Sequence, residues 1–427
     1  MKIGLEVHVA LPTKTKLFCS CKTYVEEPNT SICPICMGMP GSKPKLNKEA
    51  LKIGLSVSEA LHCKIKSRIG FVRKVYFYPD LPKSYQISQL YDPVGYNGYV
   101  DLGSKRINIR RVQLEEDPAR IYREDDYTLL DFNRSGTPLL EIVTEPDIQS
   151  EEELRGFYAE LRSILYYLGI DIDKEMKADL NISLSDSRVE IKNVTGIKNL
   201  VDAARYEIKR QSALIEKGEE PRVETRSYLP ERMTTERTRE KETDEEYGYI
   251  FEPDLTFYST TNVEKIEPVY ASAIAKEYAE KYGASEKTLL ELIAYDRNAM
   301  ELLETSAHRH GMQSIISALE TLKKFKVQMD PEKFEKVIAL VEANAALDAE
   351  RINIIAKGGE VKIGKGISEK EIEEDIEKFI AKNPGIVEEA NRNPKSINAI
   401  VGKVAKETGA NAKVVAELVS KRLGIKP

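Results

Sequence analysis

Alternating apolar and polar residues mark short segments throughout the first 260 positions of the chain. The clearest of them are Ile3 to Val9 and residues 106–114, 180–184 and 188–192. A period of two predicts strands that bury one face and expose the other. Helical patterns interrupt these strands at residues 47–61, 150–168 and 201–217. Because strands and helices follow no regular βαβ alternation, we predict an α+β fold with a mixed or antiparallel sheet.

Amphipathic helices replace the strand pattern from about Ile266 onward. They fill residues 268–357, and a glycine-rich segment at 358–366 precedes further short helices. This segment matches part of the phosphate-binding loop, but Gly366 stands where that loop needs Ser or Thr, so we predict a linker. We therefore predict a strand-rich domain at 1–262, an all-α helical domain at 263–360 and a small helical tail domain at 367–427.

Composition narrows the class of protein. The 427 residues include 64 Lys and Arg against 70 Asp and Glu, a formal net charge of -6, which argues against coating nucleic acid by bulk charge. Residues 386–427 instead carry eight Lys or Arg against four Glu, which indicates either a phosphate contact or a charged helical surface. No stretch reaches the ~18 apolar residues of a membrane span. With no leader-like N-terminus, we expect a cytoplasmic protein with no membrane partner.

Four cysteines form two close pairs, Cys19 with Cys21 and Cys33 with Cys36. In a reducing compartment, two pairs separated by a loop are typical of a tetrahedral zinc site. Four sulfur ligands fill every position, so such a site is structural rather than catalytic. The alternative is a loop of reduced cysteines without metal. The fifth cysteine, Cys63, lies in an apolar helical run and is predicted to be a core residue.

Acidic residues gather on several predicted strands. Glu6 and His8 lie two apart, so their side chains share one strand face, where they suit a metal or proton-transfer site. The alternative is a solvated strand face. Glu115, Glu116 and Asp117 follow one another before a proline, which costs self-repulsion unless a cation is near. A solvated turn is the alternative there.

Two further acidic clusters follow, and the first of them lies among residues that look buried. One spans residues 131–147, and the other joins Asp179 to Glu190 and Lys192 on two strands predicted to pair as a hairpin. Buried charges must be paired, metal-bound or neutralised. Together the clusters supply many hard oxygen ligands, which favours Mg²⁺.

Long motifs give the chain a specific resemblance. They include residues 3–9, 16–19, 38–41, 76–89, 114–117, 131–147, 224–226 and 252–255. With these motifs the chain closely resembles the B subunit of the tRNA-dependent amidotransferases, the GatB family, which convert Asp-tRNA(Asn) or Glu-tRNA(Gln) to the amide form. The motifs cover most of residues 1–258, and the helical remainder resembles the family more loosely.

The resemblance implies a catalytic cradle domain at the N-terminus and an ATP- and Mg²⁺-dependent reaction. The family phosphorylates the side-chain carboxylate of the misacylated amino acid, and ammonia from a glutaminase A subunit then displaces phosphate. A small C subunit and misacylated tRNA complete the implied partners. The basic tail resembles the family's tRNA-binding tail domain.

Site residues carry over by motif. Glu6, His8, Glu116 and Glu190 are the implied magnesium ligands, and Glu115, Asp179 and Lys192 rank second in the same catalytic motifs. Lys83, Tyr85 and Gln86 are implied to line the pocket for ATP or the aminoacyl end. Cys19, Cys21, Cys33 and Cys36 match the zinc-bearing form of the family.

Departures affect one side of the implied pocket. Residues 174–179 are shorter than the family's pattern and lack its Arg, and residues 192–196 also differ from it. The alternative function is a non-catalytic, zinc-containing tRNA-binding protein that works through its basic tail. The dense acids between 113 and 193 speak against it, because uncompensated acids repel RNA.

Overall fold

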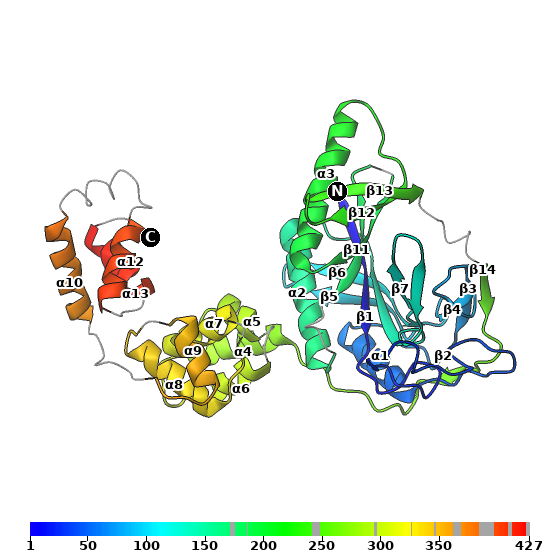
Figure 1. Cartoon of the computed structure of the whole chain (residues 1–427), viewed down its shortest axis with the longest axis horizontal. Coiled ribbons are helices and arrows are strands. Elements are labelled where there is room, and N and C mark those ends of the chain that lie inside the picture. The colour runs from blue at the N-terminus through cyan, green and yellow to red at the C-terminus, as the bar shows by residue number, and fades with distance from the viewer. Residues whose placement is uncertain are drawn as a thin grey trace. The chain divides into compact units, whose positions relative to one another are not determined.

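The computed structural model describes the chain except residues 171–175, 186, 241–247, 294–296, 326, 346, 362–368, 384–396, 409–411 and 424–427. Most of the predicted linker lies outside the described residues. The chain divides into two compact units, Met1–Tyr270 and Ala271–Pro427 (Figure 1). Strands occur in the first unit, and the described part of the second is helical, which confirms the α+β prediction.

An eight-stranded sheet organises the first unit, with the strand order β13-β12-β11-β10-β1-β9-β6-β5. Its strands are β1 (Lys2–Ala10), β5 (Gly95–Asp101), β6 (Arg106–Glu116), β9 (Pro138–Thr144), β10 (Lys177–Ser183), β11 (Val189–Thr195), β12 (Glu224–Leu229) and β13 (Thr234–Glu240). Neighbours are antiparallel except β11 and β12, so the sheet is mixed. The first strand thus lies between β9 and β10, which come more than 120 residues later.

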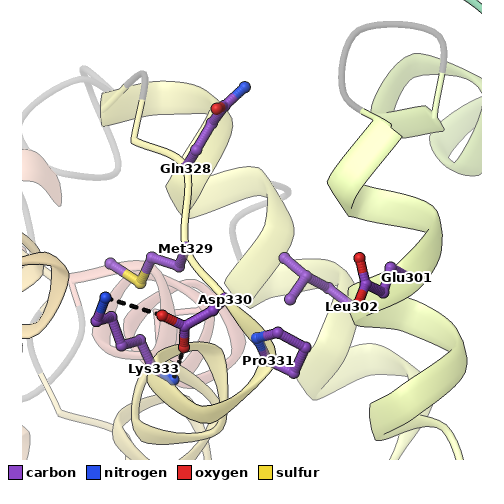
Figure 2. Close-up of a pocket in the computed structure, with 7 residues that line it drawn as sticks. All are labelled: Glu301, Leu302, Gln328, Met329, Asp330, Pro331 and Lys333. Carbon is purple, nitrogen blue, oxygen red and sulfur yellow. Dashed lines mark hydrogen bonds and ion pairs between the residues drawn. The ribbon is translucent and has the colours of Figure 1, made fainter.

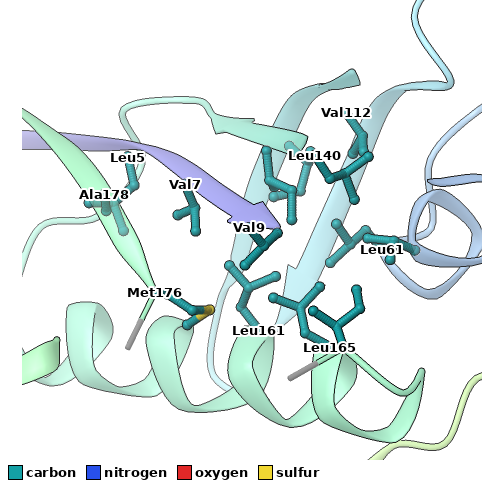
Figure 3. Close-up of a cluster of buried hydrophobic side chains, with 14 of the residues drawn as sticks. Leu5, Val7, Val9, Leu61, Val112, Leu140, Leu161, Leu165, Met176 and Ala178 are labelled. Atoms are coloured by element: carbon teal, nitrogen blue, oxygen red, sulfur yellow. The ribbon is translucent and has the colours of Figure 1, made fainter. Parts of the chain in front are cut away.

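One face of this sheet is apolar and carries the core. Leu5, Val7 and Val9 of β1 lie on it, buried beside Leu140 of β9 and Ala178 of β10 (Figure 3). Three helices contribute to this core: α1 (Lys48–Ala60), α2 (Glu151–Tyr167) and α3 (Ile197–Glu216). Strand alternation therefore sends Glu6 and His8 to the opposite face, away from the helices.

The helix starts follow the sequence signals. Asn47 caps α1 by accepting hydrogen bonds from the backbone N–H groups of Glu49 and Ala50. Ser150 caps α2 in the same way, with Glu153 N–H as its donor and three glutamates in the first turn. Such caps satisfy donors that a helix N-terminus leaves unpaired, and the acids complement the helix dipole.

Three small β elements flank the main sheet. Strands β3 (Val72–Val75), β4 (Tyr85–Ser88) and β14 (Gly248–Phe251) form a three-stranded sheet in the order β14-β3-β4. The hairpin of β7 (Arg120–Arg123) and β8 (Thr128–Asp131) is separate, as is the pair of β2 (Arg68–Ile69) and β15 (Tyr258–Ser259). Ile87 of β4 donates its N–H to Glu116 at the end of β6, 2.9 Å away, so β4 adjoins the main sheet.

Helices make up the described part of the second unit. They are α4 (Ala271–Tyr282), α5 (Glu286–Ile293), α6 (Arg297–Ser306), α7 (Met312–Phe325), α8 (Pro331–Glu342), α9 (Ala349–Ala356), α10 (Glu369–Lys382), α12 (Ile397–Thr408) and α13 (Ala412–Leu423). The last three share a hydrophobic cluster of their own that includes Ile376, Val404 and Val419. Val263 and Tyr270 pack on the core of the first unit. The three-part division predicted from the sequence, with its boundaries, stays a prediction.

A pocket in the second unit lies between α6 and the start of α8 (Figure 2). It is lined by Glu301, Leu302, Gln328, Met329, Asp330, Pro331 and Lys333. Asp330 and Lys333 pair with each other at 2.8 Å, and none of the predicted site residues lines this pocket. Among the described helices, none has the length and apolar composition needed to cross a membrane.

Candidate active site

Strand register aligns the acids of five strands on the polar face of the main sheet. Glu6 lies opposite Asp179 of β10, and His8 lies opposite Glu141 of β9. Glu141 in turn faces Gln113 of β6, and Asn181 faces Glu190 of β11. Directly opposite residues in paired strands share a face. The sheet therefore brings together residues that are far apart in the sequence.

The first cluster on this face is His8 with Glu115 and Glu141, whose ligand atoms lie within 4.8 Å of one another. His8 Nε2 lies 3.7 Å from Glu141 Oε2. Gln113 Nε2 donates to both carboxylates, at 2.8 Å to Glu115 and 3.0 Å to Glu141. The amide thus holds two buried acids side by side, an arrangement that favours a shared cation or proton.

Burial and mutual repulsion set the protonation of this cluster. Burial, with the nearby charge of Glu141, raises the pKa of Glu115 to about 7. Burial alone would lower the pKa of His8, but its contact with Glu141 outweighs this effect and raises the pKa to about 9. His8 in turn lowers the pKa of Glu141 despite the burial of that carboxylate. The cluster therefore joins one ionised carboxylate to a second one poised near neutrality.

The second cluster is Glu6 with Asp179 and Glu190, again with ligand atoms within 4.8 Å of one another. Lys192 places its ammonium 2.9 Å from Asp179 Oδ2 and 3.2 Å from Glu190 Oε1. Burial, then the charges of Glu141, Glu190 and Asp179, raise the pKa of Glu6. Crowded, buried carboxylates of this kind favour binding of a further cation in addition to Lys192.

Neighbouring polar groups orient this second cluster. Asn193 N–H donates to Asp179 at 2.7 Å, and Asn181 Nδ2 donates to Glu6 at 3.2 Å. Thr225 Oγ1 donates to Glu190 Oε2 at 3.1 Å from the parallel strand β12. Donors that fix carboxylates in this way are typical of the residues around a metal site. The oxygen-only ligand set fits Mg²⁺.

Glu116 and Lys83 form a separate pair beside these clusters. Their side chains are only 6% and 7% exposed, and Glu116 also accepts the Ile87 N–H at 2.9 Å. Gln86 Nε2 donates to the Glu116 carbonyl at 2.9 Å and to Glu115 Oε2 at 3.3 Å. Among the described residues, neither metal-competent carboxylate cluster includes Glu116.

Tyr85 lies next to this pair. Lys83 Nζ is 5.5 Å from its ring centroid, and the Arg73 guanidinium is 4.5 Å from it. Two hydrogen bonds of 2.8 and 2.9 Å join Arg73 to the fully buried Glu252. Of the predicted residues, Gln86 thus contacts Glu115 of the first cluster, Lys83 pairs with Glu116, and Tyr85 lies between the Lys83 and Arg73 cations.

Glu141 is the site residue that the sequence pattern did not single out. It lies in the matched segment 131–147 and alternates with the buried Leu140 and Ile142. That alternation places it on the polar face of a strand, but its pairing with His8 depends on the register of β1 and β9.

The four paired cysteines form a third cluster, with their sulfur atoms within 4.8 Å of one another. Cys33 and Cys36 Sγ are 3.9 Å apart, close to the ~3.8 Å between ligands of a tetrahedral ion with Zn–S bonds of ~2.3 Å. A hydrogen bond from Cys19 is the main cause that lowers the pKa of Cys36 to about 4, and fully buried Lys16 adds to it with Nζ at 3.7 Å. The donor set therefore fits zinc.

Cys63 lies outside this cluster, partly buried against the core of the first unit. Burial raises the pKa of its thiol to about 12, which leaves it protonated and unreactive at neutral pH. Its packing agrees with the core role predicted from the sequence.

The part of the chain that holds the sheet and all three clusters matches known proteins. A family model described as "GatB/GatE catalytic domain" matches residues 1–266. The B subunit of the aspartyl/glutamyl-tRNA(Asn/Gln) amidotransferase of Saccharolobus solfataricus is 39% identical over 472 residues, with 100% of each chain covered. The B subunit of the same enzyme from Persephonella marina is 36% identical over 468 residues, covering 99% of this chain and 98% of its own.

The sheet and its carboxylate face thus lie within a domain of the GatB/GatE catalytic class. The chain belongs to the family of aspartyl/glutamyl-tRNA(Asn/Gln) amidotransferase B subunits. This membership confirms the resemblance found in the sequence motifs.

Proposed function

We propose that this chain activates the side-chain carboxylate of Asp or Glu esterified to a non-cognate tRNA, using ATP, and then directs its amidation. The observation that carries the proposal is the pair of carboxylate clusters that share β1, with Glu6 in one and His8 in the other. The relatives are B subunits of a tRNA amidotransferase, which supports the substrate class.

Chemistry explains why activation must come first. A carboxylate is a poor acyl donor because neither oxygen is a good leaving group. Transfer of the ATP γ-phosphoryl group to one carboxylate oxygen releases ADP and makes that oxygen part of a leaving phosphate. Ammonia then attacks the carbonyl carbon, the C–O bond to phosphate breaks, and one proton of the ammonia passes to the leaving phosphate, so the products are the amide and hydrogen phosphate.

Glu6, Asp179 and Glu190 would hold one divalent ion, and His8, Glu115 and Glu141 would hold another. Bound Mg²⁺ would neutralise the charge of the transferring phosphoryl group. Lys192 neutralises part of the negative charge of the second cluster when no metal is bound. Its side chain is 32% exposed.

Lys83, Tyr85 and Gln86 are proposed to contact ATP or the aminoacyl end. Lys83 supplies a cation paired with Glu116, the neighbour of Glu115 along β6, and Glu116 fixes its position. Magnesium binding by Glu116, as the motifs imply, would require that Lys83 leave it. We therefore propose that Glu116 acts chiefly as the partner of Lys83. The four-cysteine cluster would hold zinc in a structural role.

The reaction needs ammonia and an aminoacyl-tRNA, and these two needs define the proposed partners. We propose that a glutaminase A subunit supplies ammonia, that a small C subunit completes the complex, and that the basic C-terminal tail contacts tRNA. The acids on the sheet disfavour the alternative, a non-catalytic zinc-containing tRNA-binding protein, since they would repel RNA without bound cations.

The test is reconstitution with the A and C subunits, ATP and Mg²⁺. Amidation of Asp-tRNA(Asn), Glu-tRNA(Gln) or both is expected with glutamine, and also with ammonium when glutamine is withheld. Absence of amide from both tRNAs with both nitrogen donors would refute the proposal. tRNA binding without magnesium-dependent ATP turnover would favour the non-catalytic alternative.

Thr225 provides a first residue-level prediction. Replacing Thr225 with Val removes the donor to Glu190 but keeps the shape of this buried side chain. We expect the Mg²⁺ concentration for half-maximal amidation to rise about tenfold, in the range typical of residues that orient metal ligands. Thr225→Ser keeps the hydroxyl and is the matched control, expected within about twofold of the original protein. An equal rise in both variants, or in neither, would contradict this role.

A further inference from the structure

The turn that holds the last two cysteines contacts Lys83 through Gly38. Three backbone hydrogen bonds wind this turn, from Met37 N–H to Cys33, from Gly38 N–H to Ile35 and from Met39 N–H to Pro34. Gly38 has a φ of +64°, in the left-handed region that favours glycine. We call residues 33–39 the knuckle.

Gly38 lies directly against Lys83. A Cβ atom at position 38 would lie 2.4 Å from Lys83 Cγ and 3.1 Å from both Lys83 Cα and Lys83 Cβ. The two latter atoms are close to the backbone, so rotation of the lysine side chain alone would not relieve the contact. The hydrogen of Gly38 therefore lets the knuckle pack on the stem of Lys83.

The other end of Lys83 is equally constrained. Its ammonium pairs with Glu116, and the side chain is only 7% exposed. Two backbone hydrogen bonds stabilise the loop that holds it: Leu81 N–H donates to the carbonyl of Tyr78, and Ser84 N–H donates to the carbonyl of Leu81. Lys83 is therefore held by the knuckle at its stem and by Glu116 at its head.

The knuckle also reaches Glu116 by a second, independent route. Buried Lys16 donates to Cys36 Sγ and, at 3.1 Å, to the carbonyl of Phe132. The next residue, Leu17, donates its N–H to Gly136, whose own N–H donates to Asp117, at 2.8 Å in each contact. Asp117 directly follows Glu116, so both members of the Lys83–Glu116 pair are tied to the four-cysteine region.

We propose that Gly38 is a positioning residue for the reaction, through which the knuckle fixes Lys83 against Glu116. The four-cysteine cluster would then serve the chemistry indirectly, by setting the place of the cation that pairs with Glu116. This inference rests on the proposed function, because the proposed role of Lys83 belongs to that reaction.

The chain offers a matched control for this position. Gly41 also has a positive φ, of +82°, but a Cβ there would meet no heavy atom within 4 Å. Gly38→Ala and Gly41→Ala therefore impose the same kind of backbone strain, and only the first disturbs Lys83.

The experiment compares these variants in the reconstituted complex. We expect Gly38→Ala to lower the kcat of amidation by about tenfold or more, since small displacements of a positioned group cost that much. The KM for aminoacyl-tRNA should stay within about threefold, zinc content should be unchanged, and Gly41→Ala should keep its kcat within about twofold. Equal kcat values for both variants would overturn the proposal.

A second comparison keeps the test decisive if Gly38→Ala folds poorly. Lys83→Ala removes the Cγ atom that the new methyl group would meet. The 3.1 Å contacts with Cα and Cβ of residue 83 remain in that background, so Gly38→Ala should lower the melting temperature by less than it does in the original protein, though still by more than Gly41→Ala does. A drop as large as in the original background would show that Gly38 acts without Lys83. Inactivity of the original complex on both tRNAs would instead refute the proposed function.

Discussion

Replacing Glu141 with Gln is expected to lower the kcat of amidation in the assembled enzyme by about a thousandfold. Glutamine keeps the shape of the side chain but removes the charge that faces His8 and, at 3.8 Å, Arg111. Loss of a charged metal ligand weakens transition-state stabilisation by several kcal/mol, and each ~1.4 kcal/mol is a factor of ten in rate. Release of phosphate from ATP should fall with amide formation.

The matched control is Glu145→Gln, just beyond the end of the same strand. Glu145 forms an ion pair with Arg110 at 2.7 Å, in which both side chains are well exposed. Exposed ion pairs contribute little to stability, so we expect its kcat to stay within about twofold. A Glu141→Gln enzyme that retains more than a tenth of the original rate would remove Glu141 from the reacting centre.

Replacing Cys36 with Ser is expected to remove zinc and destabilise the first unit. Cys36 is the cysteine with the lowered pKa, and its sulfur contacts Lys16 and the Cys33 N–H. Because metal binding to a structural site contributes folding free energy, we expect the free energy of unfolding to fall by at least ~3 kcal/mol. Metal analysis and thermal unfolding of the full chain measure the two effects.

Cys63→Ser makes the same chemical change outside the cluster and is its control. Cys63 packs on the core of the first unit and belongs to no metal-competent group of the described residues. We expect it to keep one zinc per chain. A Cys36→Ser protein that also keeps zinc and its melting temperature would exclude a four-sulfur site.

Local pattern was sufficient to predict the strand that carries the site. Alternation along Ile3–Val9 indicates that Glu6 and His8 share the face opposite Leu5 and Val7, and the structure has this arrangement. The spacing of the four cysteines likewise anticipates their meeting. In both examples the prediction concerns residues close in the sequence, so strand period and ligand spacing are informative.

Strand alternation also bears on the two adjacent glutamates of β6. Successive side chains of a strand point to opposite faces, so Glu115 and Glu116 do not belong to one cluster. The motifs favour Glu116 as a magnesium ligand, whereas the structure groups Glu115 with His8 and pairs Glu116 with Lys83. Period-two reasoning on Gln113 and Glu115 would have indicated this division.

Long-range register is what the sequence does not reveal. His8 meets Glu141 because β1 pairs with β9, and Glu6 meets Asp179 because β1 also pairs with β10. Side-chain partners across a sheet depend on this register. A slip of one residue would turn every side chain of the strand to the other face of the sheet. The contact of Gly38 with Lys83 likewise depends on how two distant loops pack.

The central claim is that this chain transfers phosphate to the aminoacyl side-chain carboxylate before amidation. The most direct measurement uses Asp-tRNA(Asn) or Glu-tRNA(Gln) with ¹⁸O in both side-chain carboxylate oxygens, in the complete complex with ATP and glutamine. Our account predicts one ¹⁸O in the inorganic phosphate for each amide formed, because the activated oxygen leaves with phosphorus. Amide formation with unlabelled phosphate would contradict it.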